Sequence, residues 1–305
     1  MLKPAGLSYR GKMEKITYNK PALNVDKQIE LLKSRNLIIS DIDYAKTILS
    51  NITYYRLSSY MKNFQRNDKF YDDISFEDIV YLYNFDKDLK SLIFENIRII
   101  EVALRTKICL QMCTNYGSHW FYDKKNFKNE EAYNKTIEIF NNEKELSKDT
   151  FIKYYFEKYS SPKLPPFWMI TEVLSLGDLS KILSRLHSND IKEISKALTP
   201  KFYTLPVIVN WIHVLANIRN FCAHHSRLWN RQLKIKLSKP QKIKQWEQNF
   251  VGIDNIYAVC FVINLLLDNN PYNDFQYKLK QLFEKYHHID ITKMGFPKSW
   301  TNFSI

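Results

Sequence analysis

Composition and periodicity predict an all-α protein, one helical domain with an N-terminal extension and a variable connection that contains short helices. Apolar residues form 45% and aromatic residues 15% of the 305-residue chain, which is enough apolar surface to build a substantial core. Glycine occurs only six times, and hairpin signals of the Asn-Gly or Asp-Gly kind are few. Apolar residues instead recur at steps of three and four over long segments, which is the period of a helix.

The first helices are expected in an N-terminal helical extension of residues 1–70. Asp26 is placed to cap a helix through "KQIELLKSR", where Ile29 and Leu32 recur at helical spacing. A second helix is expected to follow from Asp41. The rest of the chain, residues 71–305, is expected to form the main helical domain.

The longest periodic segment predicts a central helix. "SFED", from Ser75 to Asp78, has the form of a capping box, and Gly117 marks the expected end. Between these limits, apolar residues keep steps of mostly three and four: Ile79, Leu82, Leu89, Ile93, Ile97, Ile100, Leu104, Ile108 and Met112.

A polar and aromatic stretch interrupts this order, and we expect a variable helical insertion at about residues 118–165. Apolar order resumes with "FWMITEVLSLGDLSKIL", where Trp168 and Glu172 are assigned to a core helix that stops at Gly177. The apolar run from Ile256 to Leu267 is too short for a bilayer, which needs roughly 20 residues, and predicts a buried helix.

Charge and cysteine content limit the partners and the compartment. A net charge of +13 favours a polyanion such as nucleic acid, although many lysines in such a Lys-rich chain can be merely solvated. The N-terminal segment lacks the apolar run of a secretion signal, and the four cysteines contain no CxxC pair. We therefore expect a cytoplasmic protein with no membrane span, no metal and no cofactor.

The heptapeptide "RNFCAHH", from Arg219 to His225, follows an apolar helical run and is the main candidate site. Asn220 and His224 share a helical face, whereas Arg219 and His224 point about 140° apart. Histidine and arginine together suit RNA cleavage, because histidine can move the 2′-OH proton and arginine can offset charge on the phosphorane. The alternative is structural: cations at a helix C-terminus also cap carbonyl groups.

"RNFCAHH" resembles the RNxxAHH signature of the Abi-like abortive-infection proteins of the AbiD/AbiF type, within the HEPN superfamily of helical RNases. Further segments resemble that family in the same order: "KPALNVDKQIELLKSRNLII", "NITYYRLSSY", "FDKDLKSLIFENIRIIEVALRTKI" and "PPFWMITEVLSLGDLS". The single motif is short, but the ordered set is specific and covers most of the chain.

The resemblance implies a HEPN-like bundle, a phage-defence role and a metal-independent endoribonuclease site that a homodimer composes. Arg219 and His224 match the motif's paired residues and Asn220 its adjoining position, while His225 also fits a looser spacing. Such proteins are similar to type VI CRISPR effector nucleases, which implies RNA as substrate and a structured RNA as a conceivable regulator. A non-catalytic RNA-binding module of a defence or toxin-antitoxin system remains the alternative, and a nucleotide-binding or protein-interaction subunit is a third.

Four other residues are secondary candidates. Glu101 and Arg105 lie four apart on the central helix and form either a plain ion pair or a support for the motif arginine. Tyr55 and Arg56 in "TYYRLSSY" offer stacking and phosphate contacts to unpaired RNA, and helix packing explains the same residues equally well.

Overall fold

The computed structural model describes residues 17, 19, 21–146, 149–200, 207–240, 246–247, 252–271 and 273–303. Its chain divides into two compact units, an N-terminal unit (Met1–Ile79) and a C-terminal unit (Val80–Ile305). Helices dominate the described part, and its only sheet is one two-stranded hairpin. The predicted all-α class is therefore confirmed. No described helix has the length and apolar character needed to cross a membrane.

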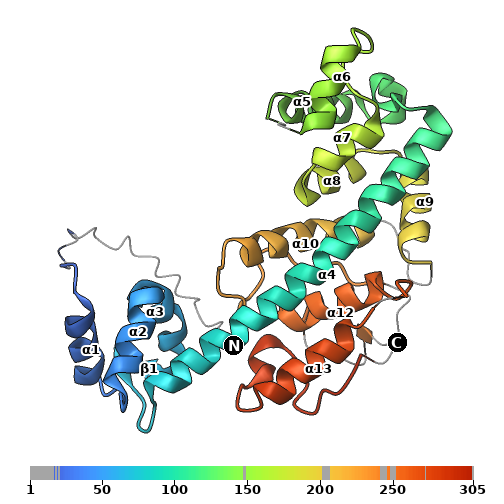
Figure 1. The fold of residues 1–305 in the computed structure, drawn as a ribbon. Coiled ribbons are helices and arrows are strands. Elements are labelled where there is room, and N and C mark those ends of the chain that lie inside the picture. Colours follow the sequence, from blue (N-terminus) through green and yellow to red (C-terminus); the bar gives the residue numbers. More distant parts are fainter. Residues whose placement is uncertain are drawn as a thin grey trace, which may run out of the picture. The chain divides into compact units, whose positions relative to one another are not determined.

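The N-terminal unit contains three short helices and a hairpin (Figure 1). Helices α1 (Val25–Ser34) and α2 (Ile42–Asn51) pack together, and α3 (Tyr54–Met61) continues into the 3₁₀ turn η1 (Lys62–Phe64). Strands β1 (Gln65–Arg66) and β2 (Lys69–Phe70) pair antiparallel through a two-residue turn. Asn67 and Asp68 both have positive φ there, as a tight hairpin turn requires.

The central helix α4 (Phe76–Tyr116) follows the predicted capping box and apolar stripe. The Asp78 amide donates to the Ser75 hydroxyl, and the Ser75 amide donates to the Asp78 carboxylate, so each satisfies the other's terminal donor. Every apolar residue of the predicted stripe is buried. The helix ends at Tyr116 because Gly117 adopts a φ of 86°, which is left-handed and favours glycine.

The segment after α4 forms short helices around an aromatic cluster. It comprises η2 (Trp120–Tyr122), η3 (Lys124–Asn126), α5 (Glu130–Leu146), α6 (Thr150–Lys158), α7 (Phe167–Val173), α8 (Leu176–Leu183) and α9 (Ser188–Leu198). Trp120, Phe121, Phe140 and Phe167 are fully buried and contact one another edge to face or at tilted angles. The expected insertion at about residues 118–165 thus contains η2, η3, α5 and α6, and its aromatic residues pack with Phe167 of α7.

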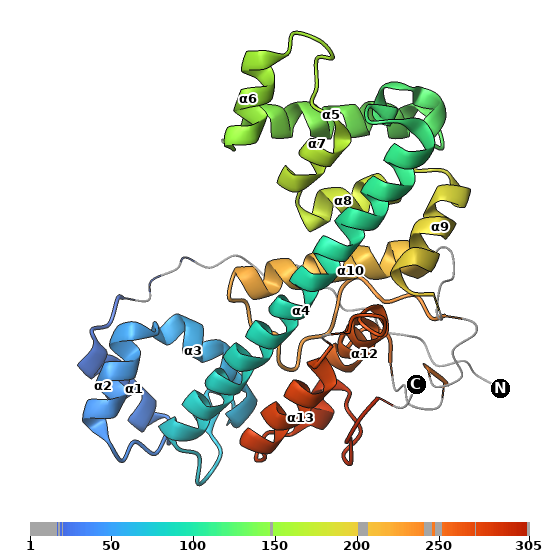
Figure 2. The ribbon, with the colours of Figure 1, turned by 45° about the vertical axis from the view of Figure 1, so that its right-hand side comes forward.

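In the described part of the C-terminal unit, three further helices lie around α4. Figure 2 shows α10 (Val207–Ala223) crossing α4. Helices α12 (Ile256–Leu266) and α13 (Phe275–Lys285) lie beside the N-terminal half of α4. Every residue of α12 is buried, which confirms the buried helix predicted from its apolar run. The short turn η4 (Ile291–Met294) follows α13. Helix α10 also packs against α8.

Two local predictions were wrong. Asn24, not Asp26, caps α1: its carboxamide oxygen accepts from the Lys27 amide, while Asp26 lies in the first turn and pairs with Lys46 at 2.8 Å. Gly177 does not stop a helix, because α7 already ends at Val173 and α8 begins at Leu176. The reason in both cases is a competing capping residue two positions earlier in the chain, Asn24 for Asp26 and Ser175 for Gly177, whose side chain accepts from the first-turn amide.

Trp168, which the sequence assigned to a core helix, is 50% exposed on α7. Its neighbour Phe167 is buried instead, so the buried face of this short helix is offset by one residue from Trp168.

Candidate functional site

The candidate motif lies at the C-terminal end of α10. The His225 amide donates to the Cys222 carbonyl at 3.1 Å, and the Ser226 amide donates to the Phe221 carbonyl at 2.9 Å. His225 has a φ of 54°, so it occupies the left-handed position that glycine usually fills. These features together form a Schellman motif, in which His224 is the last residue that continues the helical hydrogen bonding.

Arg219 sits half-buried on α10 with its guanidinium against an aromatic ring of α4. Its central carbon lies 5.7 Å from the centroid of the Phe94 ring, a cation–π distance. Its Nε is buried without a hydrogen-bond partner, and no ion pair to Arg219 is present in the described part of the chain. An unpartnered buried donor costs about 1–3 kcal/mol. Among the described residues, no carboxylate neutralises the positive charge of this side chain.

Asn220 and His224 are both exposed and lie one turn apart. The His224 amide donates to the Asn220 carbonyl at 2.9 Å, which fixes the backbone between them. Within the described residues, the His224 imidazole has no hydrogen-bond partner. The motif therefore presents an accessible imidazole five residues after a guanidinium that is held against Phe94.

A buried ion pair on α4 secures the chain directly after the motif. Asp86 is fully buried, and its carboxylate accepts from the amides of Leu228 at 3.0 Å and Trp229 at 2.6 Å. Lys90 lies one turn along α4 and pairs with the same carboxylate at 2.9 Å. Phe94 lies one further turn along α4 and contacts Arg219, so α4 contacts both the motif and the chain that follows it.

Asp86 and Lys90 were not predicted as a pair from the sequence, although a signal was present. An Asp and a Lys four residues apart interrupt the apolar stripe between Leu82 and Ile93, on the face that the stripe predicts to be buried. Charged residues on a buried face are almost always paired, so this spacing indicates an ion pair in the core.

Glu101 and Arg105 form the ion pair that was one of the two interpretations of their spacing. The Arg105 Nη2 lies 3.3 Å from the Glu101 carboxylate and donates to the Leu174 carbonyl at 2.8 Å. A second carboxylate, that of Glu172, lies 3.8 Å from Arg105. In the described residues this network connects α4 to the end of α7, and no contact with Arg219 is part of it.

Cys222, inside the motif, is not poised as a nucleophile. Burial is the main cause that raises the pKa of its thiol to about 12. The negative charge of Asp86 adds to this rise, and the positive charge of Lys90 opposes it by a smaller amount. Burial likewise raises the pKa of Cys113 to about 12 and that of Cys109 on α4. A protonated thiol is a poor nucleophile and metal ligand, so the arginine and the histidines remain the candidate reactive residues of the motif. No group of three or more His, Cys, Asp or Glu side chains suited to a metal ion occurs in the described residues.

Comparison with known proteins identifies the family. The model of the family described as "Abi-like protein" matches residues 47–230, which is more than half of the chain. The chain belongs to the Abi-like protein family. The match ends directly after Leu228 and Trp229, so it includes the motif and the residues that Asp86 binds. Family membership gives the protein a general role in abortive infection, that is, in defence against phage. Neither the curated proteins nor the solved structures contain a match.

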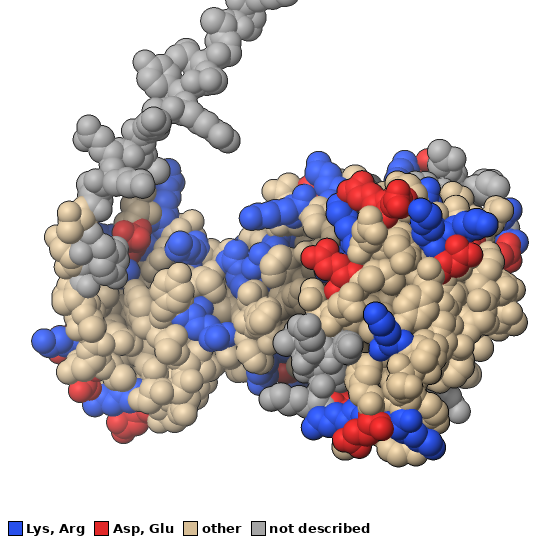
Figure 3. All heavy atoms as spheres, turned by 90° about the horizontal axis from the view of Figure 1, so that it is seen from above, with Lys and Arg blue, Asp and Glu red and all other residues tan. Residues whose placement is uncertain are grey.

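The two aromatic and basic candidates of the Abi-like protein's N-terminal unit differ in surroundings. Tyr55 is 87% exposed and lines a pocket between α1 and α3. Arg56 is exposed too, but it is not among the residues that line this pocket. Over the face that Figure 3 shows, Lys and Arg alternate with Asp and Glu and do not form one uninterrupted basic patch.

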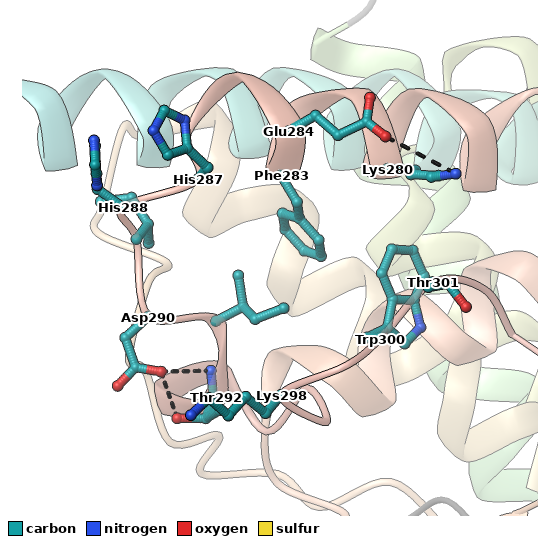
Figure 4. Close-up of a pocket in the computed structure, with 12 residues that line it drawn as sticks. Lys280, Phe283, Glu284, His287, His288, Asp290, Thr292, Lys298, Trp300 and Thr301 are labelled. Atoms are coloured by element: carbon teal, nitrogen blue, oxygen red, sulfur yellow. Dashed lines mark hydrogen bonds and ion pairs between the residues drawn. The ribbon is translucent and has the colours of Figure 1, made fainter.

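A second pocket, of about 640 Å³, lies at the C-terminal end of α13. Figure 4 shows the ring of Phe283 near its centre, with Trp300 at one side and the adjacent histidines His287 and His288 at the other. Its charged residues are balanced in sign: Lys280 and Lys298 against Glu284 and Asp290. This balance favours neither an anionic nor a cationic ligand.

Proposed function

We propose that this Abi-like protein is a metal-independent endoribonuclease that acts in phage defence, with Arg219 and His224 as its catalytic pair and Asn220 beside them. The observation that carries the proposal is the end of α10. There, among the described residues, an exposed imidazole without a hydrogen-bond partner follows an arginine that no carboxylate neutralises. A structural cap would need neither an accessible imidazole nor an unpaired guanidinium.

The chemistry needs no protein nucleophile. His224 accepts the proton of the substrate's 2′-OH, and the 2′-oxygen forms a bond to the adjacent phosphorus. The bond from phosphorus to the 5′-oxygen then breaks. A protonated histidine imidazole of the site acts as the general acid and gives its proton to this leaving oxygen. Arg219 stabilises the additional negative charge on the phosphorane. The products carry a 2′,3′-cyclic phosphate and a 5′-hydroxyl, with no water consumed in this step.

Asn220 and His225 are assigned lesser roles. Asn220 is exposed one turn before His224, where its carboxamide can donate to a phosphate oxygen or orient the imidazole. His225 holds the left-handed backbone position of the helix end, so its contribution is to the geometry of the turn as much as to the reaction.

A homodimer is part of the proposal, because one helix points Arg219 and His224 in different directions. An exposed apolar stripe on α4 supports it: Ile99, Val102 and Leu110 are 36%, 58% and 56% exposed. At 100° per residue these three side chains fall within about 80° of the helix circumference. Such a stripe suits a second copy of the chain, which would place a second motif helix near the first.

The target RNA is single-stranded or structured RNA of the cell or the phage, and a bound structured RNA or a protein antitoxin is the proposed restraint on activity. The net charge of +13 supports a polyanionic partner. The second candidate function is a non-catalytic RNA-binding module, in which Arg219 contacts phosphate and nothing is cleaved.

The test is RNA cleavage without divalent metal by the wild type and by the Arg219→Ala and His224→Ala variants, with RNA binding measured on the same samples. His213→Ala is the matched control, because His213 is also an exposed histidine of α10. We expect losses above about 100-fold for both motif variants, the usual contribution of acid–base catalysis, and unchanged cleavage by the control.

Three outcomes would contradict the proposal in different ways. Near wild-type cleavage by a folded His224→Ala variant would remove the catalytic assignment. If the wild type arrests the growth of cells and binds RNA but does not cleave it, the binding module is favoured. A 3′-hydroxyl product, or a magnesium requirement in the chemical step, would indicate a water nucleophile.

A further inference from the structure

We infer that a pocket in the N-terminal unit binds one nucleotide, supplied either by a single RNA strand or by a free mononucleotide. The pocket has a volume of about 770 Å³, inside the range of roughly 300–1,000 Å³ that is typical of small-molecule sites. All of its lining residues belong to the N-terminal unit, whereas the motif on α10 belongs to the C-terminal unit.

Helical spacing explains how the pocket forms. From α1 it takes Gln28 and Leu31, which lie three residues apart on one face, and from α3 it takes Tyr54 and Ser58, which lie four apart. Residues 21–23, directly before α1, supply a further side of the wall. Two facing helices thus define the pocket, and neither helix alone would.

The aromatic part of the pocket suits a base. Tyr55 is the most exposed of the large apolar or aromatic side chains in the described chain, at 87%, and its ring is accessible for stacking. Tyr54 lies beside it, with its hydroxyl oxygen accepting from Arg35 at 3.1 Å. An exposed tyrosine ring at the mouth of a pocket has no packing role, whereas base stacking on such rings contributes about 1–3 kcal/mol per base.

The polar part of the pocket suits a phosphate. Arg35 and Lys62 line it, and neither has a carboxylate within 4.0 Å among the described residues. Arg35 uses one of its five N–H donors on Tyr54, so most of its donors remain for a ligand. Asp68 is the single carboxylate of the lining. The two cations therefore outnumber the acids, unlike the balanced charges of the pocket beside α13.

Aromatic rings with unneutralised cations distinguish a nucleotide from other ligands. A purely apolar ligand would leave both cations without a charge partner, and both cations would repel a cationic ligand. A sugar lacks both the planar base and the charge. For the RNA-strand source, this inference rests on the proposed function, because it places the substrate's unpaired nucleotide on the N-terminal unit.

The test uses the full chain carrying His224→Ala, so that RNA stays intact. Fluorescein-labelled U10 and A10 are titrated by anisotropy, and UMP and AMP are tested both by calorimetry and as competitors. Tyr55→Ala is expected to weaken binding about 5- to 150-fold, the equivalent of about 1–3 kcal/mol. Lys62→Ala is expected to lower the slope of log affinity against log salt by about 0.7.

Matched controls lie in the same unit but outside the pocket. Tyr71 is 50% exposed and does not line the pocket, and Lys69 is an exposed lysine of β2. Tyr71→Ala and Lys69→Ala should therefore bind within twofold of the parent. U10 carrying one 5-iodouridine should form a photo-crosslink to the peptide that contains Tyr55.

The outcomes separate the pocket from the nuclease proposal. Tyr55-dependent binding of U10 alone assigns the pocket to an RNA strand, and Tyr55-dependent binding of UMP or AMP alone assigns it to a free nucleotide. Equal losses for Tyr55→Ala and Tyr71→Ala, or no binding of either ligand, would overturn the inference. If the wild type cleaves RNA but Tyr55→Ala leaves the affinity for U10 and the mononucleotides unchanged, only the pocket is contradicted. Tyr55-dependent binding without wild-type cleavage contradicts only the nuclease.

Discussion

Replacing Asp86 with alanine is expected to destabilise the C-terminal unit by about 3–5 kcal/mol. Asp86 is fully buried, and its carboxylate binds the amides of Leu228 and Trp229 as well as Lys90, whose side chain is 6% exposed. Removing it leaves a buried ammonium group without a counterion, a change that typically costs about 3–5 kcal/mol. Each orphaned amide costs about 1–3 kcal/mol by itself, but these losses overlap and do not add.

Thermal and urea unfolding measure this loss. For a domain of this size, about 3–5 kcal/mol corresponds to a fall in Tm of roughly 6–20 °C. The Asp86→Asn/Lys90→Met double variant should recover most of the loss, because it leaves no unpaired charge in the core and keeps one oxygen to accept from the amides. We expect Asp86→Asn alone to lie between the wild type and Asp86→Ala.

Asp88 provides the control for the same helix. Its carboxylate is 27% exposed and binds Lys285 and Tyr286, on the opposite side from the motif. A fall of less than about 1 kcal/mol for Asp86→Ala, or an equal fall for Asp88→Ala, would refute the reasoning. Folded Asp86→Asn should also cleave RNA more slowly than Asp88→Asn, since only Asp86 binds the chain that follows His224.

Three further predictions concern the helix end, acid stability and assembly. His225→Gly should keep or raise stability by up to about 1 kcal/mol in urea unfolding, because His225 holds a left-handed φ of 54°; a loss above 1 kcal/mol would contradict this. Burial alone would raise the pKa of Asp88, but hydrogen bonds from Lys285 and Tyr286 and the nearby lysine charges leave that pKa lowered. The stabilisation by Asp88 is thus complete above about pH 4 and is lost as pH falls through the folded pKa. The free energies of unfolding of the wild type and Asp88→Asn should therefore converge in acid; a difference that stays constant with pH would exclude this stabilisation. Mixed Arg219→Ala and His224→Ala protomers should regain part of the cleavage, whereas no recovery despite proven subunit exchange would show that each chain uses its own pair.

Local features of this protein were predictable from the sequence. The capping box at Ser75 and Asp78, the buried stripe of α4 and the stop at Gly117 follow from interactions within a few residues. The position of Arg219, Asn220 and His224 at a helix end was predictable for the same reason. Where two capping residues compete, as Asn24 and Asp26 do, local rules leave the start uncertain by about two residues.

The tertiary structure alone decided what surrounds the motif. Asp86 meets Leu228 across 142 residues of chain, and Arg105 meets the Leu174 carbonyl across 69. The pocket at Tyr55 needs α1 and α3 to face each other. Hydrogen bonds between near neighbours follow from backbone geometry, which the residue pattern specifies. Contacts between distant segments depend on the angles and offsets at which helices pack, and the same apolar stripe is compatible with several of these.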